Sequence, residues 1–447
     1  MSSEWPSVSI GEIAAPHPGS MAVGPFGSRM KADLYVSSGV RVIRGNNLSG
    51  GREPEGNYVF VSEKTADSLA SCCLKPGDLV FPHRGNIGEV GITPDDGLRY
   101  MLSTSLMKLS PDRERVNPLF LMYFFKSSIG RAALLMNTSQ VGTPGIATPL
   151  KSLRGIQLAL PSLPIQDGIA GTLSTLDDRI ALLRETNATL EAIAQTLFKS
   201  WFVDFDPVHA KQQGRTPDGV DEATAALFPD SFEESELGLV PKGWKTCPIY
   251  DLATYINGAA YKAFEPNSER RGLPIIKIAE LKSGVTSLTA YSDVAMPEKY
   301  RIETGDILFS WSGNPDTSID TFVWQHSQAW LNQHIFRVIP HATEERSFVL
   351  QMLKHLRPVF AELARNKQTT GLGHVTVADM KRLHVIRPDK AALDLFNETA
   401  APIHERVFEN EKQAQTLAAL RDTLLPRLIS GQIRLEDADT SQKATLQ

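Results

Sequence analysis

Apolar residues recur in alternating steps of three and four along two long stretches of the chain. The first seam consists of Leu173, Leu176, Ile180, Leu183, Asn187, Leu190, Ala194, Leu197 and Trp201. The second consists of Ala400, Ile403, Val407, Asn410, Ala414, Leu417, Arg421, Leu424 and Leu428. This spacing is typical of the contact seam of a coiled coil, so we predict two long helices.

The two seams are copies of one another. Every position of the second lies 227 residues after its counterpart in the first. Shorter segments ahead of each seam also match: Leu74–Phe81 with Ile302–Phe309, and Val42–Arg44 with Ile275–Lys277. We therefore predict a divergent tandem repeat with a pseudo-two-fold relation between its halves. The expected fold class is α+β: two mixed α/β domains separated by a pair of long helices.

Breaks in the periodicity give the expected domain boundaries. These are 1–163 for the first mixed domain, 164–206 for the first long helix, 207–243 for a connector, 244–390 for the second mixed domain, 391–433 for the second helix and 434–447 for a flexible tail. Pro164 suits a first helical turn, and the residue before Pro207 disfavours helix. Neither helix can bury its seam alone, so we expect the two to close as an antiparallel pair.

Two asparagines interrupt the apolar seams. Antiparallel closure brings Asn187 and Asn410 near the middle of the pair. In one interpretation they are buried and set the register of the helices, at a cost in stability. The register hypothesis predicts that Asn187→Leu raises thermal stability and loosens the spacing of the target. In the other interpretation one or both tilt towards solvent.

Charge is divided unevenly along the chain, whose net charge is −5. Residues 1–165 hold 16 Lys and Arg against 13 Asp and Glu, and residues 240–390 hold 19 against 15. Residues 166–239 hold 5 against 14. Mildly basic domains on acidic helices and connectors suit two modules that face DNA. The 3 cysteines form no paired framework, and with no signal peptide or membrane span expected, we predict a cytoplasmic protein.

The length of the first seam suggests a ruler between two readers. Leu173–Trp201 spans 29 residues, or about 43 Å at 1.5 Å per residue. B-DNA turns once in roughly 34–36 Å, so readers at both ends would meet the same groove about one turn apart.

Polar loop residues are the candidates for DNA contact. Arg and Lys suit guanine, Asn and Gln suit adenine, and small hydroxyls allow close approach. The alternative is that these residues lie in ordinary solvated turns without a role in DNA contact. Two acidic residues of the first long helix, Asp177 and Asp178, are most simply part of a solvated helix face; alternatively, they contact a partner subunit. In the first half the candidates are Arg29, Lys31, Arg44, Asn46, Asn47, Arg84, Asn86, Ser139 and Gln140; in the second they are Lys262, Lys277, Ser312, Asn314, Lys367, Gln368, Thr369, Thr370 and His374.

Signals for catalysis are absent from the sequence. Asn314–Thr317 resembles an adenine-methyltransferase box but has Asp where the second proline belongs, and neither a Walker loop nor a His-Glu-x-x-His helix occurs. His83 lies in a loop without a nearby nucleophile. We therefore expect no catalytic residue, no metal site and no cofactor pocket.

Three features together resemble the DNA specificity subunit of Type I restriction–modification systems over essentially the whole chain. They are the segment Gly24–Asn47, the paired Gly-Asp-(Leu/Ile)-(Val/Leu)-Phe segments with their loops, and the helix ends Leu197–Pro207 and Leu424–Gly431. The opening of the second domain, Asn257–Phe264, lacks the Gly-Pro-Phe-Gly form of Gly24–Gly27, which implies a different subtype and target.

The resemblance implies a non-catalytic subunit with two target recognition domains, each reading half of a bipartite sequence in double-stranded DNA. The long helices would set the gap between the halves. The expected partners are two methyltransferase subunits, which carry S-adenosylmethionine and methylate adenine, and motor-nuclease subunits; ATP with Mg belongs to the full complex. The alternatives are a stand-alone or fused methyltransferase or restriction enzyme component, and a scaffold that does not bind DNA.

Overall fold

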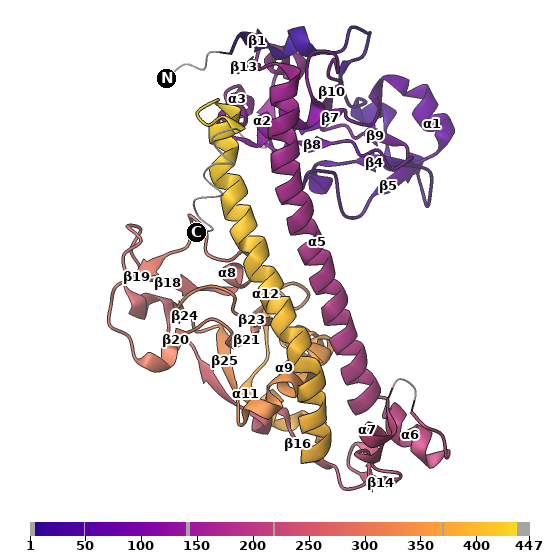
Figure 1. Cartoon of the computed structure of the whole chain (residues 1–447), viewed down its shortest axis with the longest axis vertical. Coiled ribbons are helices and arrows are strands. Elements are labelled where there is room, and N and C mark those ends of the chain that lie inside the picture. Colours follow the sequence, from indigo (N-terminus) through magenta and orange to yellow (C-terminus); the bar gives the residue numbers. More distant parts are fainter. Residues whose placement is uncertain (1–4, 49, 140–143, 218–219, 369–370, 436–447) are drawn as a thin grey trace. The chain divides into compact units, whose positions relative to one another are not determined.

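A computed structural model describes residues 5–48, 50–139, 144–217, 220–368 and 371–435. It divides into two compact units (Figure 1). Unit 1 comprises residues 1–181 and 414–447, and unit 2 comprises residues 182–413. Both units mix helices with small sheets, as the sequence predicts.

Two helices of 40 residues each, α5 (Leu163–Phe202) and α12 (Lys390–Ile429), run through both units. Every predicted seam position is buried or half-buried. In unit 1, Leu173 of α5 shares a core with Leu425 and Leu428 of α12. In unit 2, Phe198 of α5 packs against Phe396 of α12, with ring centroids 5.9 Å apart. Within unit 2, Asn187 contacts Asn410 while Phe198 contacts Phe396. Within unit 1, Asp177 contacts Arg421 while Leu173 shares a core with Leu428. Within each unit the pairing is therefore antiparallel, as predicted.

Unit 1 contains two main sheets. The first is antiparallel, in the order β2 (Met21–Val23), β10 (Leu106–Leu109), β7 (Leu79–Pro82), β8 (Gly91–Ile92). The second has the order β3 (Tyr35–Val36), β5 (Val59–Val61), β4 (Val40–Ile43), β9 (Tyr100–Leu102), β6 (Cys73–Leu74). Smaller pairs join β1 (Ser7–Ser9) to β13 (Gln157–Ala159) and β11 (Thr138–Ser139) to β12 (Gly145–Ile146). The helices are α1 (Glu63–Ser68), α2 (Pro118–Lys126), α3 (Ser128–Leu135) and α4 (Pro149–Arg154).

Unit 2 repeats this arrangement. Its first sheet has the order β17 (Ala253–Asn257), β25 (Ile335–Pro340), β21 (Ile307–Ser310), β23 (Asp320–Val323), and its second β19 (Tyr291–Ser292), β18 (Leu273–Ile276), β24 (Ala329–Leu331), β20 (Arg301–Ile302). Smaller pairs join β16 (Lys245–Pro248) to β27 (His384–Arg387) and β22 (Ser312–Gly313) to β26 (Gly373–His374). The helices are α8 (Ile278–Ser283), α9 (Arg346–His355), α10 (Arg357–Arg365) and α11 (Val377–Arg382).

The strand orders confirm the tandem repeat. The sheet β2-β10-β7-β8 corresponds strand for strand to β17-β25-β21-β23. In the second sheets β4 pairs with β9 in parallel, as β18 does with β24. Strands β7 and β21 contain the last three residues of the matching Gly-Asp-x-x-Phe segments, and every residue of both strands is buried. Continuous apolar runs of this kind suit strands that are covered on both faces.

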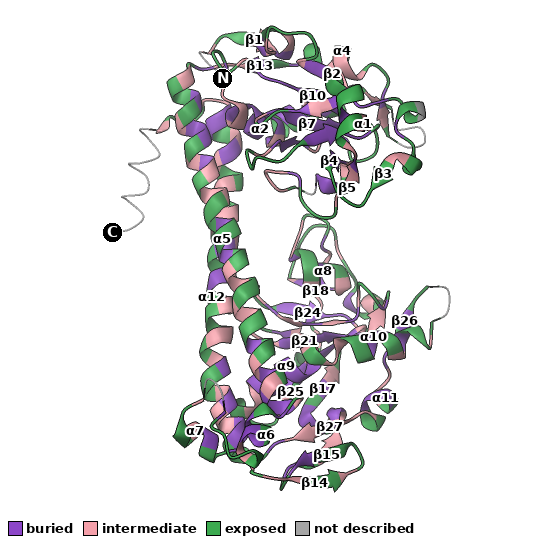
Figure 2. Cartoon of the chain, turned by 90° about the vertical axis from the view of Figure 1, so that its right-hand side faces the viewer, coloured by how far each residue is buried: buried purple, intermediate pink, exposed green. Residues whose placement is uncertain are grey.

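The connector folds onto unit 2. It forms α6 (Asp206–Gln212), α7 (Glu222–Ala226) and the hairpin β14 (Phe232–Ser235)–β15 (Gly238–Pro241). Phe228 and Trp244 are buried in the same core as Phe202 of α5, and Phe232 packs against that core. The connector is thus packed onto unit 2 through aromatic residues. Buried and exposed residues alternate along both long helices (Figure 2).

None of the helices that the structure describes is long and apolar enough to cross a membrane.

Candidate nucleic-acid interface

A polar turn between β9 and β10, Ser103–Ser105, gathers the loops of unit 1. The amide of Ser103 donates to the carbonyl of Ile43 at 2.9 Å, and the amide of His83 donates to Ser105 at 2.9 Å. Gly24 lies against the same turn, where a Cβ would sit 1.8 Å from the Ser103 carbonyl, so only glycine fits. The segments after β2, β4 and β7 therefore meet at one place.

A fourth segment joins this group through backbone pairing. Arg84 forms an isolated β-bridge with Gly145, at the start of β12, which pairs with β11. Several predicted contact residues are exposed on the gathered segments: Arg29, Lys31, Asn46, Arg84, Asn86 and Ser139. Gln140 lies outside the described residues. This loop cluster carries cations and amides, the groups that bind phosphates and base edges.

Two predicted contact residues instead hold the loop together. Asn47 is 1% exposed, and its amide donates to the carbonyls of Glu55 at 2.8 Å and Asn57 at 3.2 Å. Its side-chain oxygen accepts from the Arg44 amide at 3.0 Å. The Arg44 guanidinium donates to the Asn57 carbonyl at 3.1 Å. Asn47 therefore orders the loop from inside, and Arg44 is partly engaged in the same way.

Unit 2 gathers its loops around the corresponding turn, Asn332–His334, between β24 and β25. The Asn332 amide donates to the Ile276 carbonyl at 3.1 Å, and the Trp311 amide to His334 at 3.3 Å. Gly258 lies against this turn, where a Cβ would be 2.2 Å from the Asn332 carbonyl. Ser312 pairs with His374 between β22 and β26. The same four segments thus converge in both units.

The predicted residues of unit 2 also divide by exposure. Lys262, Asn314, Gln368 and His374 are exposed, Lys277 and Ser312 are half-buried, and Thr369 and Thr370 lie outside the described residues. Lys277 lies over the Tyr261 ring at 5.2 Å.

Lys367 and Asn314 have structural partners. Both carboxylate oxygens of Asp379 lie within hydrogen-bond distance of the Lys367 ammonium, Oδ1 at 2.6 Å and Oδ2 at 2.5 Å, which holds it against α11. Asn314 accepts from the amides of Asp316 at 2.9 Å and Thr317 at 3.2 Å through its side-chain oxygen, which orders the turn after β22.

Sequence reasoning missed the turns themselves. Thr104 is exposed, and Gln333 and His334 are half-buried; the side-chain nitrogens of Gln333 and His334 lie 3.1 Å apart. The sequence pattern that could have identified these turns is a short polar triplet between two apolar strands, at matching places in both repeats. His83 has a lowered pKa because its ring is buried, and Nε2 contacts the Thr104 carbonyl at 3.2 Å, which fits a supporting role.

The helix pair contains a buried amide contact within unit 2. Asn410 is 2% exposed and donates to the Asn187 side-chain oxygen at 2.9 Å, while Asn187 donates to the Val407 carbonyl at 3.0 Å. Asn410 is therefore buried, as in the first interpretation, whereas Asn187 is half-buried. Their role in register stays a prediction.

Asp177 departs from the expectation of a solvated face, whereas Asp178 lies on an exposed face as expected. Asp177 accepts from the Tyr123 hydroxyl at 2.6 Å and from Arg421 at 2.7 Å. Asp178 pairs with Arg52 at 2.7 Å. Burial and the Asp177 carboxylate raise the pKa of Tyr123. These carboxylates bind α5 to α2, to α12 and to the loop of Arg52 within unit 1.

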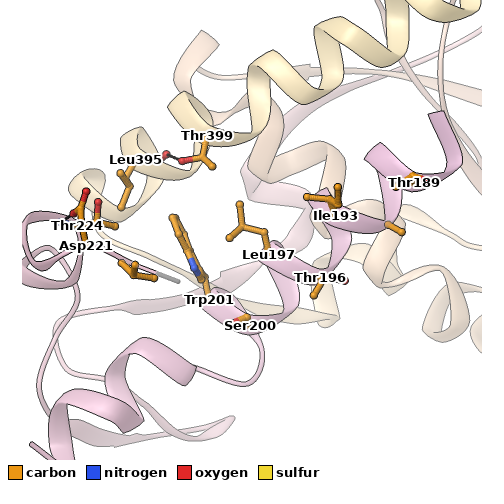
Figure 3. A pocket seen from close by; sticks show the side chains of 12 residues that line it. Thr189, Ile193, Thr196, Leu197, Ser200, Trp201, Asp221, Thr224, Leu395 and Thr399 are labelled. Atoms are coloured by element: carbon orange, nitrogen blue, oxygen red, sulfur yellow. Dashed lines mark hydrogen bonds between the residues drawn. The ribbon is translucent and has the colours of Figure 1, made fainter. Parts of the chain in front are cut away.

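An apolar groove of about 650 Å³ lies between α5, α12 and α7 in unit 2 (Figure 3). Ile193, Leu197 and Trp201 of α5 line one side, and Leu395 and Thr399 of α12 line the other. Thr224 of α7 closes its end. Among the residues that the structure describes, no group of His, Cys, Asp and Glu could hold a metal ion.

Comparisons with known proteins agree with this architecture. A family model described as the Type I restriction modification DNA specificity domain matches residues 3–192 and 241–414. The HindI specificity subunit of Haemophilus influenzae is 27% identical over 419 residues, covering 83% of this chain and 89% of that protein. The MjaIX specificity subunit of Methanocaldococcus jannaschii is 24% identical over 397 residues, covering 85% and 84%.

A solved structure shares the fold. The S subunit of a Type I restriction–modification system from M. genitalium superposes with a TM-score of 0.53 at 15% identity, covering 95% of this chain and 96% of that one. The family model recognises both repeats, and the match spans most of the sequence. The chain therefore belongs to the family of Type I restriction–modification DNA specificity proteins.

Proposed function

We propose that this chain is the non-catalytic subunit that gives a Type I restriction–modification complex its DNA sequence specificity. Each unit reads one half of a bipartite target in double-stranded DNA. The observation that carries the proposal is the duplicated convergence of four polar loops around Ser103–Ser105 and Asn332–His334. Two similar but not identical reading faces on one chain suit an asymmetric target with two halves.

The partners in this proposal are methyltransferase subunits that methylate adenine, and motor-nuclease subunits. S-adenosylmethionine, and ATP with Mg, belong to those subunits. The groove between α5 and α12, lined by Ile193, Leu197 and Trp201, supports docking of a partner helix, because an apolar face flanked by small polar residues suits helix packing.

Methylation mapping tests the proposal directly. Cells that express this chain with its methyltransferase should carry adenine methylation at one bipartite motif. Arg84→Ala in unit 1 should change or relax only one half of the motif, and Gln333→Ala in unit 2 only the other. A variant in one unit that changes both halves, or a complex without any specific motif, would contradict the proposal. Binding of S-adenosylmethionine by the isolated chain would favour a fused enzyme instead.

A further inference from the structure

Unit 2 contains a cavity of about 770 Å³ between β23, α9 and α12. Phe322 and Val323 of β23 and Leu350 of α9 form its apolar walls. Glu405 and Glu409 of α12 add carboxylates at its border. Strand β23 is the edge strand of its sheet, so the cavity runs along a sheet edge.

The corresponding place in unit 1 is filled by a segment of the chain itself, Gly50–Pro54. The Ile92 amide of edge strand β8 donates to the Arg52 carbonyl at 3.0 Å. Lys126 of α2 donates to the carbonyls of Gly50 and Gly51, both at 2.6 Å. The Arg52 guanidinium pairs with Asp178 of α5 at 2.7 Å.

The cavity walls are the repeat counterparts of the surfaces that this segment covers. Val323 of β23 pairs with Ile307 of β21, just as Ile92 of β8 pairs with Leu79 of β7 in unit 1. Lys354 lies 228 residues after Lys126, and Glu405 lies 227 residues after Asp178. Val323, Lys354 and Glu405 all line the cavity of unit 2. In unit 2 the loop after α8 begins at Gly284, which lies against the ring of His326.

Two residues that line the cavity have a buried polar atom without a partner among the described residues. Thr321 is 6% exposed, and neither its hydroxyl nor the side-chain carbonyl of Gln325 has a hydrogen-bond partner within the described part of the chain. Buried polar groups are rarely left unsatisfied. Of the two cations that line the cavity, Lys354 pairs with Glu191 at 2.5 Å and Arg346 donates to the carbonyl of Gly305. The carboxylates of Glu405 and Glu409 therefore favour a cationic ligand.

We propose that this cavity binds an extended, Arg- or Lys-bearing peptide segment of a partner subunit. The segment runs along β23 as Gly50–Pro54 runs along β8, and its cation pairs with Glu405 as Arg52 pairs with Asp178. Sheet edges are common docking places for extended peptides, because the backbone supplies hydrogen bonds and neighbouring pockets select side chains. The inference rests on the proposed function, which supplies the partner subunit.

Photocrosslinking in the purified complex with its methyltransferase subunit tests this site. Benzoylphenylalanine at Phe322, and separately at Phe408, should crosslink to a segment of another subunit that contains Arg or Lys. Glu405→Arg should lower the yield at least tenfold. Glu398→Arg is the matched control, because Glu398 is exposed on the same helix and does not line the cavity.

The outcomes separate the site from the function. Crosslinks confined to this chain, crosslinks to DNA, a small-molecule adduct or no crosslink at either position would overturn the peptide site while the complex still methylates its bipartite target. A crosslinking yield that Glu405→Arg leaves unchanged would also overturn the peptide site. Absence of any methylated target in the wild-type complex would overturn the proposed function itself.

Discussion

Asn187 and Asn410 show how one buried contact changes an expectation drawn from sequence. From the sequence, Asn187→Leu should raise stability because it adds an apolar residue to the seam. In the structure that substitution leaves the amide of Asn410, 2% exposed, without its acceptor. A buried donor without a partner costs about 1–3 kcal/mol.

We therefore expect Asn187→Leu to lower the thermal unfolding midpoint. Asn187→Leu with Asn410→Leu should raise it above that of the single variant, because no buried amide remains. Differential scanning calorimetry of both variants measures this. If the single variant alone is more stable than the wild type, the amide pair is not closed in solution.

Arg84 and Arg44 are both candidate base contacts, but their surroundings differ. Arg84 is exposed beside Asn86, whereas Arg44 already donates to the Asn57 carbonyl. Arg84→Ala should cost about 1–3 kcal/mol of specific DNA binding and relax one target position. Lys151→Ala, an exposed cation on α4, is the control. Gel shifts with matched and mismatched targets test this, and equal loss on all sequences would make Arg84 a phosphate contact.

His404 gives unit 2 a pH-dependent stability. Burial lowers its pKa from 6.5 to about 4; Glu191 of α5 opposes this shift, and Lys354 and Arg346 of α9 favour it. Between these pH values the unfolded chain binds more protons, so stability is full above about pH 6.5 and falls as the pH drops towards 4. His404→Gln should reduce the difference in urea midpoint between pH 7 and pH 5. An unchanged difference would show that other groups cause it.

At the scale of elements, each long helix is held by polar contacts as well as by its seam. Asp177 of α5 joins Tyr123 of α2 and Arg421 of α12 within unit 1. Its side chain is 17% exposed, whereas that of Asp178 is 60% exposed. Removing one member of a shielded network leaves the others unpaired, while an exposed ion pair contributes little.

Neighbouring substitutions on one helix can separate these two cases. Asp177→Ala should lower the free energy of unfolding by about 1–3 kcal/mol, because the Tyr123 hydroxyl and Arg421 lose an acceptor. Asp178→Ala should cost about 0–1 kcal/mol. Urea denaturation of the two variants gives the comparison. Equal costs would mean that solvent replaces the Asp177 contacts.

At the scale of the whole molecule, we expect the length of the two long helices to set the gap between the halves of the DNA target. Each is one uninterrupted helix of 40 residues. Deleting one heptad from each should shorten the gap in the DNA target by about 10 Å of helix rise, or about three base pairs. Methylation mapping would report the new gap. Replacing the same heptads by others of equal length should leave the gap unchanged, and an unchanged gap after deletion would contradict the ruler.

The two repeats also differ from one another at equivalent places. Unit 1 covers its sheet edge with Gly50–Pro54, whereas unit 2 leaves a cavity along β23. The turns on which the loops converge differ too: Ser-Thr-Ser in unit 1 and Asn-Gln-His in unit 2. Shared topology with different loops suits one architecture that reads two different half-sites.

The sequence by itself determined the two long helices, the repeat and the family, because seam periodicity and duplicated motifs are properties of residue order. It also located most of the loops that converge. Only the tertiary structure decided which polar side chains face inward: Asn47, Lys367 and Asp177 look like surface residues in the sequence yet hold loops and helices together. It alone brought Ser103–Ser105 beside Gly24 and left the cavity along β23. The physical reason is that burial and partnership depend on packing between segments distant in sequence, which local periodicity does not encode.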